Sequence, residues 1–150
     1  MKWLLDTNVV SETIKGRPRE SVVSWIARLT ADEMTISIIT AAEIKNGISS
    51  APDGVRRKLV SWLENELEPR FAGRVLSLST DVLIDWLRLS RKLAAERMMR
   101  RATDLLIAST ARVHGLTVVT RNVRHFADTG VVVYDPWSGK THTMDSPDAR

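Results

Sequence analysis

The stretch Lys2-Trp-Leu-Leu-Asp6-Thr-Asn-Val-Val-Ser-Glu12 decides the fold of this protein. It opens on a short apolar segment, Lys2–Leu5, which is too short for a helix and is followed at once by Asp6, Thr7 and Asn8. This order predicts a buried strand that leads through a turn into a helix. We therefore expect strand and helix to alternate from the start of the chain.

The same alternation continues along the 150 residues. Apolar, often β-branched runs predict strands, at Met34–Ile39, Val75–Leu78, Leu116–Thr120 and Val131–Tyr134. Apolar residues at helical spacing predict helices around residues 22–29, 40–47, 52–69, 79–94 and 102–113. Strands that are separated by helices favour parallel pairing. We expect an α/β fold in which helices cover both faces of a mainly parallel central sheet.

Local signals predict where these helices begin and end. Thr40 and Glu43 form a Thr-x-x-Glu pattern that is typical of a capping box, so a helix is expected to start at Thr40. The run Ser79-Thr80-Asp81 offers a cap for the long helix over residues 79–94. Pro69 is expected to stop the helix before it, and Gly115 is expected to end the helix over residues 102–113.

Composition narrows the class of protein. The chain is 43% hydrophobic and 27% charged, which is typical of a globular domain, and it has no cysteine for a disulfide framework or a thiolate zinc site. No apolar run approaches the roughly 20 residues that span a bilayer, so we expect no membrane association and a cytoplasmic location. Residues 1–137 are expected to form one domain, and the polar residues 138–150 a frayed tail.

The net charge of +4 comes from one short segment, residues 86–101. This segment contains one acidic residue and six basic ones, namely Arg88, Arg91, Lys92, Arg97, Arg100 and Arg101. Such a run is typical of a surface that faces phosphate groups. It is also typical of a solvated helix face that keeps a protein soluble, and charge alone favours this second interpretation.

Polar residues follow the predicted strands at comparable places. Asp6 ends the first strand, Glu43 lies one helical turn beyond the second, and Asp104 opens a later helix. The segment Thr120-Arg-Asn122 ends a further strand. Each carboxylate alone could cap a turn or a helix. Because functional groups in parallel sheets gather beyond the carboxyl ends of the strands, we expect these residues to converge in one cleft.

Carboxylates that lie close together repel one another, and the site must offset this repulsion. Two like charges 4 Å apart repel by about 4 kcal/mol at an effective dielectric constant of about 20. The site must therefore raise the pKa values of its carboxyl groups or bind a cation. Carboxylate oxygens, with no cysteine and only three scattered histidines in the chain, favour Mg²⁺ or Mn²⁺ over zinc. Such a cation suits phosphodiester hydrolysis, because it activates water and stabilises the leaving oxygen.

These residues also carry a family resemblance, which extends over about residues 1–137. The sequence resembles the four motifs of PIN-domain proteins at Leu4–Glu12, Thr40–Gly47, Asp104–Ala108 and Thr120–Asn122 with Phe126. The final Tyr134–Trp137 looks like the FitB-like branch, so the chain is similar to the VapC/FitB-type toxins of bacterial toxin–antitoxin pairs.

The resemblance implies a compact three-layer α/β/α fold and an endoribonuclease that uses Mg²⁺ or Mn²⁺. It also implies a homodimer that a small cognate antitoxin protein holds inactive. By matched position, it implies that Asp6, Glu43 and Asp104 are the catalytic metal ligands. The apolar and basic surface over residues 86–101 is expected to receive the antitoxin tail.

The fourth motif departs from the family pattern. Family members carry an acid where either Asn122 or His125 stands here, and Asp128 is displaced from that place. Asn122 is expected to coordinate the metal through its carbonyl or to orient a metal-bound water. His125 is expected to be a loop residue near the cleft with no ligand role.

Other residues are expected to support the same chemistry. The hydroxyls of Thr7 and Thr120 would orient metal ligands or a phosphate oxygen. The basic residues expected to contact RNA phosphates are Arg97, Arg100, Arg101 and Arg121. A surface salt bridge is the alternative for Arg121.

Two other functions compete with nuclease activity. The missing fourth acid would also suit a non-catalytic module that binds RNA or a partner protein. A phosphotransfer enzyme with Asp6 as the acceptor is disfavoured, because Asn8 stands where such enzymes need a second aspartate. Divalent-metal-dependent RNA cleavage is the favoured function.

Overall fold

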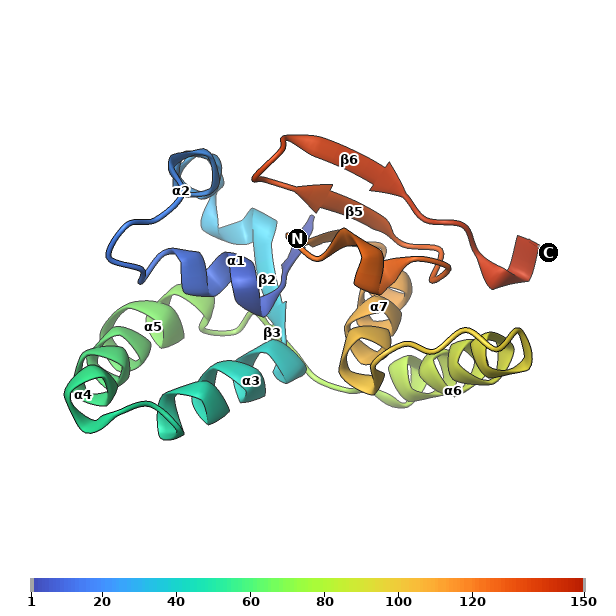
Figure 1. Ribbon diagram of the computed structural model, residues 1–150, viewed down its shortest axis with the longest axis horizontal. Helices are drawn as coiled ribbons and strands as arrows, with labels where there is room; N and C mark the ends of the chain where they lie inside the picture. The colour runs from blue at the N-terminus through green and yellow to red at the C-terminus, as the bar shows by residue number, and fades with distance from the viewer. Residues whose placement is uncertain (1, 150) are drawn as a thin grey trace.

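The computed structural model describes residues 2–149 and has a central sheet with helices on both faces (Figure 1). The strands lie in the order β3-β2-β1-β4-β5-β6. Their bounds are β1 Trp3–Leu5, β2 Met34–Ser37, β3 Val75–Leu76, β4 Thr117–Val119, β5 Val132–Asp135 and β6 Lys140–Thr143. Strands β1 to β5 pair in parallel, whereas β6 runs antiparallel to β5. The predicted α/β class and mainly parallel sheet are confirmed.

The core is divided between the two faces of the sheet. Leu5 and Val119 contribute to one cluster and Leu4 and Val118 to the other, because successive strand residues point to opposite faces. The first face is covered by α1 Thr7–Glu12, α2 Glu20–Ala27, α3 Ile38–Ser49, α4 Asp53–Trp62, η2 Leu63–Leu67 and α5 Glu68–Phe71. The second face is covered by α6 Thr80–Ala95 and α7 Ala102–His114. The three-layer α/β/α arrangement is therefore confirmed.

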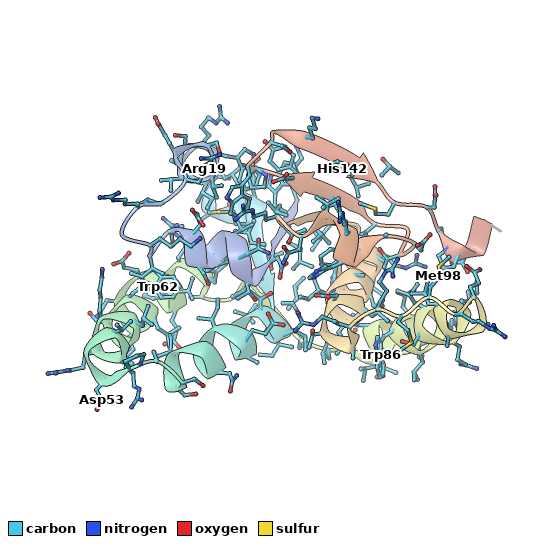
Figure 2. The ribbon with its side chains drawn as sticks, in the orientation of Figure 1. Arg19, Asp53, Trp62, Trp86, Met98 and His142 are labelled. Atoms are coloured by element: carbon cyan, nitrogen blue, oxygen red, sulfur yellow. The ribbon has the colours of Figure 1, made fainter. Side chains whose placement is uncertain are left out.

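Short 3₁₀ helices complete the chain at η1 Ala31–Glu33, η3 Val123–Phe126 and η4 Pro147–Ala149. In Figure 1 the helices α1 to α5 lie in the left half of the view and α6 and α7 in the right half. Figure 2 labels Trp62 and Trp86, which lie in these opposite halves.

No helix within residues 2–149 is both long and apolar enough to cross a bilayer.

Two predicted helix ends are confirmed. Ser79 is the N-cap of α6, and its side chain accepts a hydrogen bond from the backbone N–H of Val82. Gly115 follows α7 with φ of 63°, in the left-handed region that glycine adopts without a steric penalty.

The predicted start of α3 is wrong by two residues. The helix begins at Ile38, because Ser37 ends strand β2 and its hydroxyl accepts a hydrogen bond from the N–H of Ile39. Thr40 is fully buried, and its hydroxyl lies 3.5 Å from the carbonyl oxygen of Leu5. No capping box forms at Thr40, and Glu43 is left to reach another partner.

Pro69 does not stop its helix at once. The helical run continues to Phe71, with Pro69 in the first turn of α5. The preceding segment η2 is π-helical, with a wider turn than an α-helix. This change of helical type lets the run pass a residue that has no N–H to donate.

The expectation of a frayed tail after residue 137 is also wrong. Residues 140–143 form β6, and their register pairs Val133 with His142 and Asp135 with Lys140. Beyond this strand, Asp148 forms ion pairs with Arg112 and Lys92. Polar edge strands carry no apolar alternation, so the sequence gives little signal for such an element.

Candidate active site

The candidate site lies where the strand order changes direction. From β1 the chain builds the sheet outward to β2 and β3, and after α7 it returns to place β4 on the other side of β1. The register pairs Leu5 of β1 with Val119 of β4, so Asp6 and Thr120 follow side by side. The backbone N–H of Asp6 donates to the carbonyl of Val119 at 2.9 Å. Such a switch point is the usual place for a binding site in a parallel sheet.

Hydrogen bonds fix the carboxylate of Asp6. Its Oδ1 accepts from the backbone N–H of Thr7 at 2.8 Å, and its Oδ2 accepts from the hydroxyl of Thr120 at 2.7 Å. The Asn8 amide also donates to Oδ2, at 3.2 Å. Asp6 thus caps α1, one of the uses considered from sequence, while it also contacts the end of β4.

Asn8 is a site residue that the sequence analysis did not single out. Its amide nitrogen lies 3.0 Å from the Thr120 hydroxyl, and its Oδ1 accepts from the backbone N–H of Arg121 at 3.1 Å. The side chain therefore joins the end of β1 to the end of β4. The only signal in the sequence is its place in the Asp-Thr-Asn turn, which does not reveal a partner 112 residues away.

Thr7 connects the first and second carboxylates. Its hydroxyl donates to Oε2 of Glu43 at 2.5 Å, while its backbone N–H is bonded to Asp6. Glu43 reaches this position because α3 packs against α1 on the same face of the sheet. The predicted orienting role of Thr7 has this contact as its structural basis.

Asp104 lies in the first turn of α7, which covers the other face of the sheet. It is 8% exposed, and its Oδ2 lies 3.3 Å from Nδ1 of His125. His125 belongs to η3, directly after the segment that follows β4. His125 thus lies beside the site, as expected, and its ring contacts a candidate ligand; the expectation that it has no ligand role of its own stays a prediction.

The charges of neighbouring carboxylates affect the pKa values of Asp6 and Asp104. Burial raises the pKa of Asp6, and the nearby charge of Asp104 adds to this, although hydrogen bonds from Thr120 and Thr7 oppose the shift. Burial also raises the pKa of Asp104; His125 and Arg101 oppose that shift and the charge of Glu43 adds to it. Asp6 and Asp104, and likewise Asp104 and Glu43, are thus within electrostatic range of each other.

The donor types at the site fit a hard divalent cation. Three carboxylates, two of them buried and destabilised in their charged form, are the ligands that Mg²⁺ and Mn²⁺ prefer. Across residues 2–149, no three His, Asp or Glu side chains are close enough as they stand to share one metal ion.

The remaining predicted residues lie around the site in different ways. Asn122 is exposed, and its backbone N–H donates to the Thr120 hydroxyl at 3.0 Å. The Arg121 guanidinium lies over the ring of Trp137, 5.7 Å from its centroid. This contact engages Arg121 beside the site, and its role toward RNA stays a prediction.

The basic residues of the 96–101 loop have separate environments. Arg100 donates to Oδ2 of Asp128 at 3.1 Å and to the carbonyl of Ala127 at 3.3 Å, so it ties this loop to the segment after η3. Arg101 is exposed and near enough to Asp104 to influence its pKa. Arg97 is exposed as well, with φ of 58°. Asp128, the displaced acid of the fourth motif, thus pairs with an arginine.

Comparison with known proteins defines the class. The model of the PIN domain family matches residues 3–132, which is most of this chain. The protein therefore belongs to the PIN domain family.

Its relatives within the family are toxins and ribonucleases. It is 35% identical to Toxin FitB of Neisseria gonorrhoeae over 135 residues, which cover 89% of this chain and 97% of FitB. It is also 35% identical to a VapC ribonuclease of Sinorhizobium fredii, over 89% of this chain and 96% of the relative. The crystal structure of FitAcB from N. gonorrhoeae contains a chain with a TM-score of 0.84 and 34% identity, covering 90% of this chain and 98% of that one.

Proposed function

We propose that this protein is a divalent-metal-dependent endoribonuclease and the toxin of a toxin–antitoxin pair. The observation that carries the proposal is the approach of Asp6, Glu43 and Asp104, from three separate elements, at the switch point of a PIN-domain sheet. The VapC and FitB relatives share almost the whole length of the chain, which supports the same activity here.

In the proposed reaction, Asp6, Glu43 and Asp104 hold Mg²⁺ or Mn²⁺. When bound, the ion would supply an activated water and neutralise charge on the phosphate. Thr120 and Asn8 hold the Asp6 carboxylate in place, and Thr7 holds Glu43. In hydrolysis, the water oxygen forms a new bond to phosphorus, the bond to the leaving ribose oxygen breaks, and that oxygen takes up a proton.

The basic residues near the site would supply attraction to the RNA backbone. Arg97 and Arg101 are exposed on the loop that leads into α7, close to Asp104. Arg100 acts differently in this proposal, because its ion pair with Asp128 holds the loop in place. Asn122 is proposed to contact the metal-bound water or the substrate from its exposed position after β4.

RNA cleavage by the purified protein tests the proposal. We expect cleavage of a structured RNA with Mg²⁺ or Mn²⁺, none with a chelator, and a loss of about 10³-fold or more in Asp6→Asn, as for removal of one essential catalytic group. The Asp6→Asn protein, prepared identically, controls for a contaminating nuclease. Metal-dependent RNA binding without cleavage would instead support the non-catalytic module.

A cognate antitoxin is the proposed protein partner, since the related solved structures are toxin–antitoxin complexes. The face that carries α1 to α5 has a cavity of about 450 Å³ between α2 and the helical run over residues 53–71, lined by apolar residues together with Glu66 and Arg70. Val23, Trp62 and Phe71 are among its lining residues. We propose that a segment of the antitoxin docks here, and not over residues 86–101 as the sequence suggested. Val23→Glu should then escape inhibition by the cognate antitoxin, and retained inhibition would exclude this cavity.

A second copy of the chain is the proposed partner of α6. Its exposed face has Ile84 and Leu87 at the centre, Asp81 at one end and Arg88 and Arg91 at the other. An antiparallel pair of these helices around a two-fold axis would bury the apolar residues and bring Asp81 of each copy toward the arginines of the other. Ile84→Glu should convert a dimer into a monomer in sedimentation. A wild-type monomer would contradict this assignment.

A further inference from the structure

His125 has a defined contact at the candidate site. Its Nδ1 lies 3.3 Å from Oδ2 of Asp104, whose side chain is 10% exposed. The His125 side chain itself is 40% exposed, so one edge of the ring meets the carboxylate and part of the ring remains accessible. The arrangement brings an imidazole to a buried carboxylate at the centre of the candidate site.

The two buried carboxylates of the site differ in how they are held. Asp6 accepts hydrogen bonds from Thr7, Asn8 and Thr120. Among the side chains that the structure describes, His125 is the one recorded in polar contact with the carboxylate of Asp104. The imidazole is therefore the polar group best placed to orient this carboxylate.

The element that carries His125 is itself well anchored. The backbone N–H of His125 donates to the carbonyl of Asn122 at 3.0 Å, and the next residue, Phe126, is fully buried against α7 and β5. On the far side of η3, Arg100 bonds to Ala127 and Asp128. The ring is thus mounted on a segment fixed at both ends, as a group that orients another must be.

We propose that His125 is a positioning residue that donates its Nδ1–H to Oδ2 of Asp104 and leaves the other carboxylate oxygen free for the metal ion. Carboxylates and histidines around metal ions are commonly held by such outer hydrogen bonds. This inference rests on the proposed function for its purpose. In this chain, the fourth motif would act by fixing a ligand that is already present.

The state of the imidazole in the metal-free protein tests the contact directly. We expect long-range ¹H–¹⁵N correlation spectra in alkaline buffer to show His125 as the Nδ1–H tautomer, with its signals assigned by their loss in His125→Asn. His114 and His142 provide internal comparison. An Nε2–H tautomer for His125 would overturn the proposal, because the nitrogen facing Asp104 would then have no proton to donate.

Mn²⁺ binding, followed by electron paramagnetic resonance, tests the consequence without using activity. Asn places a donor near the position of Nδ1, so His125→Asn should bind Mn²⁺ within about threefold of the wild type. His125→Ala and His125→Gln should bind about 10–100-fold more weakly. Arg124→Ala, on the exposed side of the same element, is the matched control and should bind normally. Circular dichroism melting checks that each variant is folded.

Two results of the metal experiment would overturn the inference. One is unchanged Mn²⁺ affinity in folded His125→Ala. The other is a directly coordinated nitrogen in the electron spin echo spectrum of the wild type that disappears in His125→Asn, since the imidazole would then be a ligand. If the tautomer and the affinities agree with expectation but no RNA is cleaved, the positioning role stands and the nuclease function fails.

Discussion

Asp104 holds its carboxylate almost entirely out of solvent, in the first turn of α7 and near two other acids. Burial raises its pKa above the ordinary 3.8, so the folded protein holds this proton more tightly than the unfolded chain. Stability therefore falls as the pH rises from about 3.8 through the raised pKa, and it stays lower at neutral pH. The charged form of Asp104 therefore lowers the free energy of unfolding, although the proposed chemistry needs this charged form.

Asp104→Asn should accordingly raise the melting temperature of the metal-free protein at neutral pH while it removes RNA cleavage. For a domain of this size, each kcal/mol of relieved strain is worth about 2–4 °C. Calorimetry from pH 3 to pH 8 should show the difference between variant and wild type growing as the pH rises. Asp32→Asn, at an exposed position, serves as the control. A variant less stable than the wild type at pH 7 would contradict this account.

The pKa of Glu12 is shifted in the opposite direction to that of Asp104. Glu12 is 3% exposed at the end of α1, where its carboxylate pairs with Lys15 at 2.5 Å and accepts from the backbone N–H of Arg19 at 2.8 Å. Burial raises its pKa, but these hydrogen bonds and the charges of Lys15 and Arg121 outweigh burial, so the net pKa is below the ordinary 4.5. Glu12 therefore adds stability above pH 4.5, and this is lost as the pH falls through its lowered pKa.

Glu12→Gln should cost about 1–3 kcal/mol at pH 7, the usual range for hydrogen bonds to a buried charged group. The difference in melting temperature from the wild type should shrink as the pH is lowered below 4.5. The same change at exposed Glu20 should have little effect. A Glu12→Gln difference that is constant from pH 7 to pH 3 would exclude the ion pair as its cause.

At the scale of elements, the start of α3 determines where Glu43 lies. Ser37→Ala removes the side chain that caps this helix and should destabilise the protein by about 1 kcal/mol, within a usual range of 0.5–2. Thr40→Val keeps the buried volume and should cost less, because the Thr40 hydroxyl has only a 3.5 Å contact. Urea denaturation measures both. A larger loss of stability in Thr40→Val than in Ser37→Ala would indicate that Thr40, and not Ser37, caps the helix.

This helix start also shows where prediction from sequence fails. Ser37 and Thr40 both have hydroxyls that can cap a helix, and local sequence does not distinguish them. The choice is made by the sheet, because β2 pairs with β1 on one side and β3 on the other, and Ser37 is its last paired residue, opposite Leu76. Pairing with two distant strands thus overrides the local capping pattern.

Asp6, Glu43 and Asp104 could be proposed as site residues from sequence because each sits at a fixed distance from a recognisable strand or helix start. In a parallel sheet, that distance is enough to predict convergence at one edge. The roles of Asn8 and His125 could not be found in this way. Their partners, Thr120 and Asp104, are set by how α1, η3 and α7 pack together, which no local pattern encodes.

At the scale of the whole molecule, the last residues close the sheet on one side. Strand β6 covers the outer edge of β5, and the segment after it is tied down by the ion pair between Asp148 and Arg112. Arg112 also bonds to Asp85 of α6 and to the carbonyl of Thr129, so it connects the end of the chain to both helices of that face. The sequence-based division at residue 137 therefore separates parts that are packed together.

A chain that ends at Trp137 should lose stability and associate with itself. It lacks the β6 hydrogen bonds, which are worth about 0.5–1.5 kcal/mol each, and it exposes the free edge of β5 to other molecules. Calorimetry should show a lower melting temperature, and light scattering should show larger species at high concentration. A full chain with Asp148→Ala should be affected less, because β6 remains. Equal melting of the truncated and full chains would mean that residues 138–150 contribute nothing.

The distribution of the site along the chain has a consequence for synthesis. Asp6 leaves the ribosome early, but Asp104, Thr120 and His125, which surround it, are translated much later. A nascent chain that is stalled or released before about residue 104 lacks α7 and so cannot cleave the message from which it is read. If the enzyme acts on RNA as proposed, it becomes harmful only when its own translation is almost finished.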